Sequence, residues 1–115
     1  AWGRESVAQL FDRKAEAPDA MFCGNDQIAR GAAEALRDRG IKVPDDVSIV
    51  GFDNWDVMAE GARPPLTSID MNLNALGHEA GERLIGMIAG EKVSGARRLP
   101  CSLVIRGSCG GGAQS

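Results

Sequence analysis

Aromatic and histidine residues are scarce in this 115-residue chain, which contains two Trp, three Phe, no Tyr and one His. The single His78 lies in a segment of helical periodicity, and no partner can be assigned to it that would make it a general base. Ser48 and Ser68 lack the glycine-flanked turn that exposes a nucleophilic serine. We therefore expect no enzymatic activity.

Cysteine is also sparse, and the three residues Cys23, Cys101 and Cys109 have no close spacing. An odd, dispersed set argues against a disulfide framework or a zinc site. Cys23 and Cys101 stand among apolar residues, so both are predicted to be small core side chains. The segment 24–27, GNDQ, lacks the glycine spacing of a phosphate-binding loop. We expect neither a metal nor a cofactor.

Long apolar runs and excess positive charge are absent as well. No run approaches the ~20 apolar residues that span a membrane. The net charge is -3 and the sequence pI is about 5.1, which argues against nucleic-acid binding by this chain itself. The chain starts at Ala1 without Met or a secretory signal pattern. These features suggest a fragment of a longer, cytoplasmic protein.

Helical and strand-like segments alternate along the chain, whose composition is that of one modest globular domain. Periodicity predicts helices at 4–15, 26–39 and 72–89, a short helix or irregular loop at 54–62, and strands at 20–23, 47–52, 66–70 and 99–105. This order predicts an α/β fold with a mainly parallel sheet and helices on both faces. The strand at 20–23 lacks polar alternation, which predicts that both its faces are covered.

The helix at 72–89 has unusual features. Asn72 is a candidate N-cap, while Gly90 suits its end, as Gly40 suits the end of the preceding long helix. Gly77, Gly81 and Gly86 lie inside it, which favours close packing against a neighbour. Its predicted buried stripe consists of Leu73, Leu76, Ala80, Leu84, Met87 and Ile88.

Two polar pairs follow two predicted strands, Asn25-Asp26 after the first and Asp53-Asn54 after the second. In a parallel sheet, both pairs lie at the carboxyl edge, where ligands gather. Each pair is also well placed to cap the next helix without any further function. Carboxylate and amide groups would suit a hydroxyl-rich or polar heterocyclic ligand, so both interpretations stay open on spacing alone.

Several segments together resemble the effector-binding core of lac repressor family transcription regulators. They are PDAMFCGND, QIARGAAEALRDRGIKVPDDVSIVGFDN, RPPLTSI, LGHEAGERLIGMI and LPCSLVIRGS, which stand in order over about residues 3–108. The combination of ND, VPDDVSIVGFD and PPLTSI is the specific part.

The resemblance implies the C-terminal lobe of a periplasmic-binding-protein-like fold, incomplete in this chain. It assigns 1–70 to the C-terminal lobe and 71–95 to the N-terminal lobe. It assigns 96–108 to a return strand, and leaves 109–115 as a disordered tail. It further implies a DNA-binding head outside this chain, through which alone operator DNA would be bound.

The resemblance also implies site residues. It places Asn25 and Asp53 in the effector cleft and leaves Asp26 mainly as a helix cap. Trp55 would line the cleft mouth or the dimer surface. Trp2 stands near, but out of register with, the family's stacking aromatic residue.

The helix at 26–39 and the loop at 56–63 resemble the dimer surface of the family, with Arg30, Glu34 and Met58 as candidate contacts. Two-fold symmetry would repeat each contact. The resemblance thus implies a homodimer, or a larger oligomer, that senses a small polar effector, most often a sugar.

The expected function is effector sensing and dimerisation in a bacterial transcriptional repressor. The main alternative is a secreted sugar-binding protein of a transporter, which shares the fold, and a weaker one is an enzyme of doubly wound fold. The apolar stripe at 72–90 would lack its partner in this chain, so we expect it to recruit a second copy in preference to folding back or staying mobile.

Overall fold

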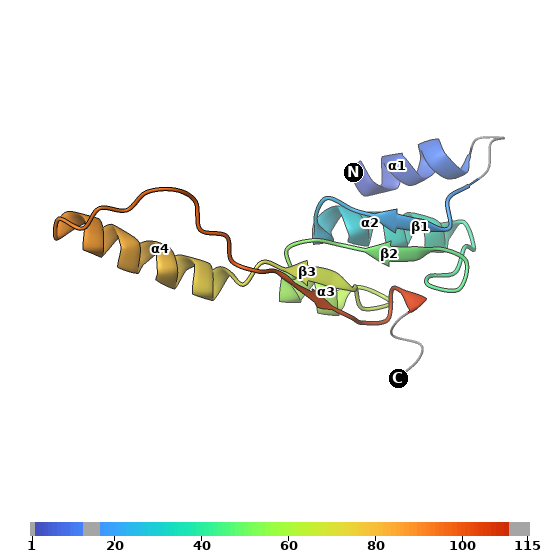
Figure 1. Cartoon of the computed structure of the whole chain (residues 1–115). Helices are drawn as coiled ribbons and strands as arrows, with labels where there is room; N and C mark the ends of the chain where they lie inside the picture. The colour runs from blue at the N-terminus through green and yellow to red at the C-terminus, as the bar shows by residue number, and fades with distance from the viewer. Residues whose placement is uncertain (1, 13–16, 111–115) are drawn as a thin grey trace.

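Helices and strands alternate along the chain in the computed structural model, which describes residues 2–12 and 17–110 (Figure 1). The elements are α1 (Trp2–Phe11), β1 (Ala20–Phe22), α2 (Asp26–Asp38), β2 (Ser48–Val50), α3 (Asp56–Gly61), β3 (Ser68–Asp70), α4 (Leu73–Ile88) and β4 (Ser102–Val104). The predicted α/β order is confirmed. The first helix begins at Trp2, not residue 4, and residues 13–16 lie outside the described part.

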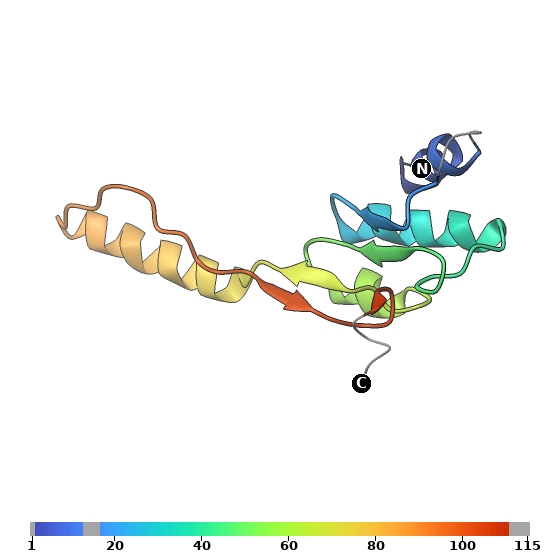
Figure 2. The same cartoon turned by 45° about the vertical axis from the view of Figure 1, so that its right-hand side comes forward.

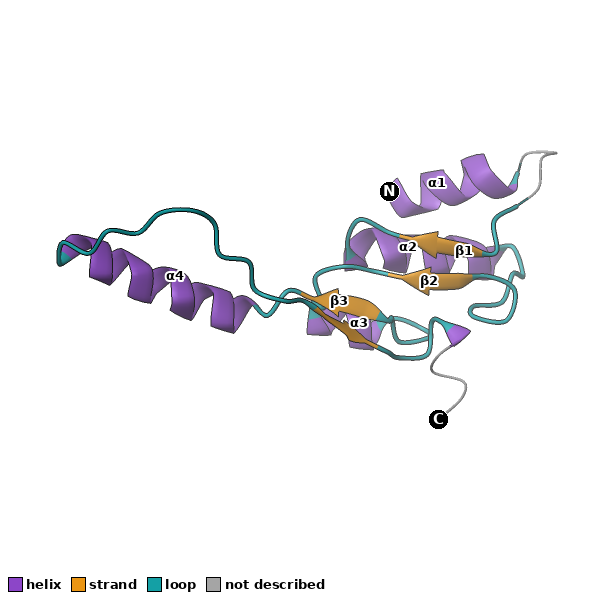
Figure 3. Ribbon diagram, viewed as in Figure 1, coloured by secondary structure: helices purple, strands orange, loops and turns teal. Residues whose placement is uncertain are grey.

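The strands form one parallel pair, β1 with β2, and one antiparallel pair, β3 with β4. β1 and β2 are parallel, with Met21 opposite Ile49. A parallel bridge between Val50 and Thr67 brings the start of β3 beside β2. β4 returns antiparallel to β3, with Leu103 opposite Ile69. This register places the carboxyl ends of β1, β2 and β3 at one edge (Figure 3).

The core lies between the strands and α2. α2 and α3 lie behind the strands on the same face, and α1 packs along α2 (Figures 1 and 2). Val7 of α1, Ala32 of α2 and Ile49 of β2 are fully buried. α1 and α2 approach closely because Gly3 has no side chain: a Cβ there would lie 2.1 Å from the carbonyl oxygen of Ile28.

The opposite face of β1 is open in the described part of the chain. Phe22 is 73% exposed, so a strand expected to be covered on both faces is covered on one. Cys23 is buried as predicted, and burial raises the pKa of its thiol to about 11, which keeps it protonated and unreactive. The prediction of a core position for Cys101 is wrong, because it lies exposed beside the edge strand β4.

The segment 71–101 forms an arm that extends away from the rest of the molecule (Figures 1 and 2). The chain measures 61 × 31 × 22 Å with a radius of gyration of 18.2 Å, against about 13 Å for a compact domain of this length. No residue of α4 is buried. The return segment is tied to α4 by an ion pair of 2.9 Å between Arg97 and Glu79.

The apolar stripe of α4 is therefore uncovered within this chain. Its most exposed large side chains are Leu73, Leu84, Ile85, Met87 and Ile88, each more than half exposed. No atom lies within 4 Å of a Cβ built at Gly77 or Gly81, so the close packing expected there is not made by the described residues. Recruitment of a second copy stays a prediction.

The predicted helix ends are partly confirmed. Gly40 and Gly90 take the left-handed conformation, with φ of 72° and 98°. Asn72 does precede α4, but the prediction that its side chain caps the helix is wrong. Its backbone is left-handed and its N–H donates to the carboxylate of Asp70 at 2.7 Å, so the turn is held by Asp70 instead.

Cys109 is the part of the predicted tail for which the structure shows a contact. Cys109 lies against Thr67, with 3.1 Å between its Sγ and the threonine hydroxyl, and residues 111–115 lie outside the described part. No helix among the described residues is long and apolar enough to cross a membrane.

Candidate functional site

The carboxyl ends of the three parallel strands are bound to one another through the backbone. The N–H of Asp26 donates to the carbonyl of Phe52 at 2.9 Å, and the N–H of Asp53 donates to the carbonyl of Ile69 at 3.0 Å. The two polar pairs of the sequence therefore lie at one edge, as the parallel sheet predicts.

Asp26 is a buried structural carboxylate, with 1% of the residue exposed. It accepts a hydrogen bond of 2.7 Å from the backbone N–H of Trp55 and one of 2.6 Å from the hydroxyl of Ser68. A Cβ at Gly51 would lie 2.3 Å from the carboxylate, so the glycine makes room for it. Asp26 thus joins the segments that follow β1 and β2 to the start of β3.

The helix cap at α2 is Asn25, which corrects the assignment of Asp26 to that role. The side-chain oxygen of Asn25 accepts the N–H of Ile28 at 2.8 Å. The side-chain oxygen is therefore occupied by the cap, and the amide nitrogen can still donate a hydrogen bond to a ligand.

Asp53 has an uncommitted carboxylate. Its backbone lies at a φ of 104°, a region that side-chain-bearing residues adopt at a cost of about 1–3 kcal/mol and that clusters at functional sites. No hydrogen bond to its side chain is made by the described residues. The half-buried carboxylate is therefore free to accept hydrogen bonds from a ligand.

A hollow of about 640 Å³ adjoins Asp53. It is lined by Asp53, Asn54, Trp55, Asp56, Val57, Met71 and Leu73. Carboxylates that accept hydrogen bonds stand here beside apolar side chains, and Trp55 is 53% exposed. Such a surface suits a small ligand that has hydroxyl groups and a ring face.

The structure brings Asp53 and Trp55 to this hollow but does not bring Asn25 or Trp2 to its lining. Trp2 lines a separate hollow with Gly3, Gln27, Ile28 and Gly31. Sequence reasoning missed Met71 as part of the site and assigned Leu73 to the buried stripe of the helix. Their position directly after the strand end at Asp70 was the signal that could have found them.

The three candidate dimer residues lie together on the α2–α3 side of the molecule. Arg30 forms an ion pair of 3.5 Å with Glu34, and its guanidinium donates to the sulfur of Met58 at 3.7 Å. Both ends of the ion pair are more than one-third exposed. The grouping is compatible with an interface.

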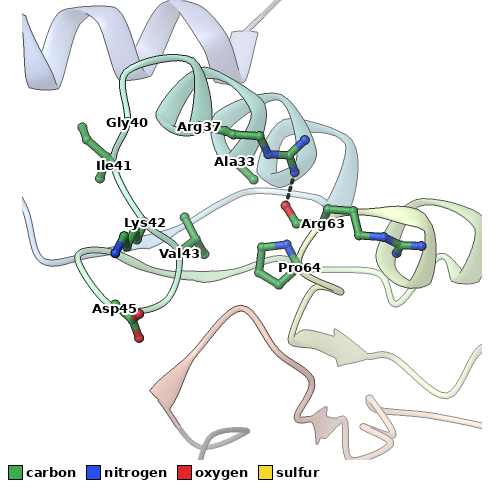
Figure 4. A pocket seen from close by; sticks show the side chains of 9 residues that line it. All are labelled: Ala33, Arg37, Gly40, Ile41, Lys42, Val43, Asp45, Arg63 and Pro64. Carbon is green, nitrogen blue, oxygen red and sulfur yellow. Dashed lines mark hydrogen bonds between the residues drawn. The ribbon is translucent and has the colours of Figure 1, made fainter.

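Another hollow, of about 460 Å³, lies at the carboxyl end of α2 (Figure 4). The side chain of Arg37 donates there to the carbonyl of Arg63. In Figure 4 the cationic ends of Lys42 and Arg63 point away from each other. Because its polar groups do not converge, this hollow has less of the character of a ligand site than the one at Asp53. Among the described residues, no group of three His, Cys, Asp or Glu side chains could hold a metal ion.

Comparison with known proteins gives one consistent family. Residues 1–109 match the family model described as a periplasmic binding protein-like domain. The HTH-type transcriptional repressor CytR of Escherichia coli K12 is 41% identical over 107 residues, which are 92% of this chain and 31% of that protein. The lactose operon repressor of the same strain is 39% identical over 89 residues, or 77% of this chain and 24% of that protein.

Solved structures agree. The lac repressor dimer bound to operator and the anti-inducer ONPF matches with a TM-score of 0.85 and 34% identity, over 93% of this chain and 37% of that one. The complex of the transcriptional regulator CelR with cellobiose matches with a TM-score of 0.80 and 36% identity, over 92% of this chain and 32% of that one. This chain thus spans about a third of the length of the curated relatives it matches most fully.

Proposed function

Because this chain belongs to the lac repressor family and carries its periplasmic-binding-protein-like domain, we propose that it senses an effector and dimerises in a bacterial transcriptional repressor. The observation that carries the proposal is the hollow at the strand edge, where the uncommitted carboxylate of Asp53 stands beside the apolar side chains of Trp55 and Leu73. The protein acts in the cytoplasm and catalyses no reaction.

The effector is a small, hydroxyl-rich molecule, most simply a sugar. Asp53 accepts hydrogen bonds from its hydroxyl groups, and Trp55 contacts its apolar ring face. The amide nitrogen of Asn25 is the second polar contact, reached when the cleft closes. Two relatives are named for the lactose and sucrose operons, and a third is solved with cellobiose, which supports the sugar class.

The hollow lies where two parts of the fold meet. We assign residues 1–70 to the C-terminal lobe, 71–95 to the N-terminal lobe and 96–108 to the return strand. Asp53 belongs to the first part, whereas Met71 and Leu73 stand at the start of the second. An effector in the hollow therefore contacts both parts and favours one arrangement of the lobes over another.

The signal reaches DNA through a segment outside this chain. A net charge of -3 gives this domain no electrostatic footprint for DNA. The effector instead changes operator affinity by shifting the population of lobe arrangements, and by linkage operator binding changes effector affinity by the same factor.

The α2–α3 surface that carries Arg30, Glu34 and Met58 forms the homodimer contact. Two-fold symmetry places each of these residues against the partner copy twice. The lac repressor structure that this chain resembles is a dimer, which supports this arrangement.

The alternative is a secreted sugar-binding protein of a transporter. The curated relatives are transcriptional repressors and regulators, which favours the regulator. The gene sequence upstream of Ala1 discriminates between the two, because a regulator encodes a helix-turn-helix head there and a transport protein encodes a signal peptide.

A thermal-shift screen of the full-length protein tests the effector site. Lactose, sucrose and cellobiose are the first probes, followed by monosaccharides and nucleosides. A compound that binds the folded state raises its melting temperature. We expect Asp53→Asn to remove most of that shift and Asp45→Asn, the same change at an exposed loop position, to leave it unchanged. Equal shifts in the wild type and Asp53→Asn would contradict the assignment.

A further inference from the structure

Asn54, the residue after Asp53, makes three hydrogen bonds at the edge of the hollow. Its side-chain amide donates to the carboxylate of Asp70 at 3.0 Å, and its side-chain oxygen accepts from the guanidinium of Arg106 at 2.7 Å. Its backbone N–H donates to the hydroxyl of Ser68 at 3.0 Å. A single side chain therefore joins a carboxylate at the end of β3 to a guanidinium beyond β4.

The two partners of Asn54 are themselves fixed. The guanidinium of Arg106 also donates to the carbonyl of Leu66 at 2.7 Å, and its side chain is only 14% exposed. The other carboxylate oxygen of Asp70 accepts the N–H of Asn72 at 2.7 Å. We name Asn54, Asp70 and Arg106 the Asn54 cluster.

The Asn54 cluster lies close to the start of the arm. β3 leads into the arm and β4 returns from it (Figures 1 and 2). Asp70 stands at the last residue of the outgoing strand, and Arg106 lies two residues past the end of the returning strand. Asn54 thus contacts the end of the outgoing strand, next to the arm, and the segment that follows the returning strand on the body side. It directly follows Asp53 in the sequence.

The backbone of Asn54 supports the same interpretation. Its φ of 53° and that of 104° at Asp53 place two successive non-glycine residues in the left-handed region. Asn is among the residues that tolerate this conformation best. Asp53 and Asn54 therefore form a short segment of constrained backbone.

We propose that Asn54 is a positioning residue that couples the effector loop to the arm, by holding Asp70 at the end of the outgoing strand and Arg106 just past the returning strand at once. The inference deepens the proposed function, since it rests on Asp53 being an effector contact. It adds a route by which occupancy of the hollow changes the angle between the two parts of the fold.

Hydrogen exchange in the full-length protein tests this coupling, first without ligand and then with the strongest binder from the sugar screen, which should slow exchange at 68–76 and 102–107 in the wild type but not in Asn54→Gly. Asn54→Gly keeps the left-handed backbone and removes both side-chain bonds. We expect exchange to accelerate about tenfold or more in peptides covering 68–76 and 102–107, because the hydrogen bonds lost there involve charged partners. Exchange in the peptide covering 29–36 of α2 is expected to stay unchanged, which separates local opening from a general loss of stability.

Asn72→Gly is the matched control, because Asn72 is also left-handed and its side chain makes no cap bond. It should leave exchange in both peptides near the wild-type rate. Asn54→Asp should open the outgoing strand, since it sets two carboxylates together, while still accepting from Arg106. Adding Asp70→Asn to Asn54→Asp exchanges donor and acceptor and should restore slow exchange at 68–76.

Two results would overturn the proposal. One is unchanged exchange at 68–76 and 102–107 in Asn54→Gly. The other is equal acceleration in α2, which would make Asn54 a general stabiliser of the fold. Neither result bears on the assignment of Asp53, because the thermal-shift screen tests that residue separately.

Discussion

The hydroxyl of Ser68 donates a hydrogen bond of 2.6 Å to the buried carboxylate of Asp26, which lies 42 residues earlier in the chain. This bond joins the start of β3 to the first turn of α2. The same carboxylate holds the backbone of Trp55, so one buried acidic side chain positions the loop that carries Asp53.

The first prediction concerns this carboxylate. Asp26→Ala leaves the hydroxyl of Ser68 and the N–H of Trp55 without their partner, at about 1–3 kcal/mol for each unsatisfied group. We expect the free energy of unfolding to fall by about 2–4 kcal/mol, measured by urea denaturation. Asp45→Ala, at an exposed position, is expected to change it by less than ~0.5 kcal/mol. Similar values for the two variants would contradict the role of Asp26.

A second prediction contrasts two glycines in helices. Gly3→Ala places a Cβ 2.1 Å from the carbonyl oxygen of Ile28, and this overpacking should destabilise the protein by about 1–3 kcal/mol. In the monomeric 115-residue chain, Gly77→Ala meets no atom within 4 Å and should stabilise the protein by about 0.5–1 kcal/mol through helix propensity. Thermal unfolding of both variants provides the check. A stabilised Gly3→Ala variant would show that α1 and α2 are not in close contact.

A third prediction separates the two roles of Asn25. Asn25→Ser keeps a side-chain oxygen for the helix cap, so stability should stay within ~0.5 kcal/mol, whereas Asn25→Ala should lose about 1 kcal/mol. If the amide nitrogen also binds the effector, both variants bind it more weakly. Calorimetric titration with the strongest binder from the sugar screen measures this. Wild-type affinity in Asn25→Ser would assign Asn25 to capping alone.

The sequence predicted features that depend on residues close together in the chain, and it did not predict contacts between residues far apart in the chain. The glycine ends at Gly40 and Gly90 and the strand–helix alternation depend on neighbours within a few residues, and sequence patterns report such neighbours well. The family resemblance supplied Asp53, and the structure then showed its uncommitted carboxylate beside the hollow.

The predictions that were wrong depend on contacts between segments that are distant in the sequence. Asp26 was assigned as a helix cap, because the sequence does not show that Ser68, 42 residues later, binds its carboxylate. Cys101 was assigned to the core from its apolar neighbours, which do not show that the strand beside it is uncovered. The cluster of Asn54, Asp70 and Arg106 spans 52 residues between Asn54 and Arg106. No local pattern marks such a grouping.

A fourth prediction concerns pH. The backbone N–H of Asn72, and after it the side chain of Asn54, lower the pKa of Asp70 below its usual value. A depressed folded-state pKa stabilises the fold above the unfolded pKa, near 3.9, and this contribution is lost as pH falls through the folded value. Titration of the Asp70 carboxyl carbon by NMR should show the lowered pKa, and Asn54→Gly should raise it part of the way back. An ordinary pKa at Asp70 in the wild-type protein would contradict this.

The most direct measurement of the central claim is operator binding by the full-length protein, titrated with the strongest binder from the sugar screen. In Asp53→Asn, operator affinity without effector should stay within about threefold of the wild type, because Asp53 is proposed to contact the effector and not the operator. The effector concentration at half response should rise by about tenfold or more, since a hydrogen bond to a charged group contributes about 1.5–3 kcal/mol. A half-response concentration equal to that of the wild type would show that the hollow at Asp53 is not the effector site.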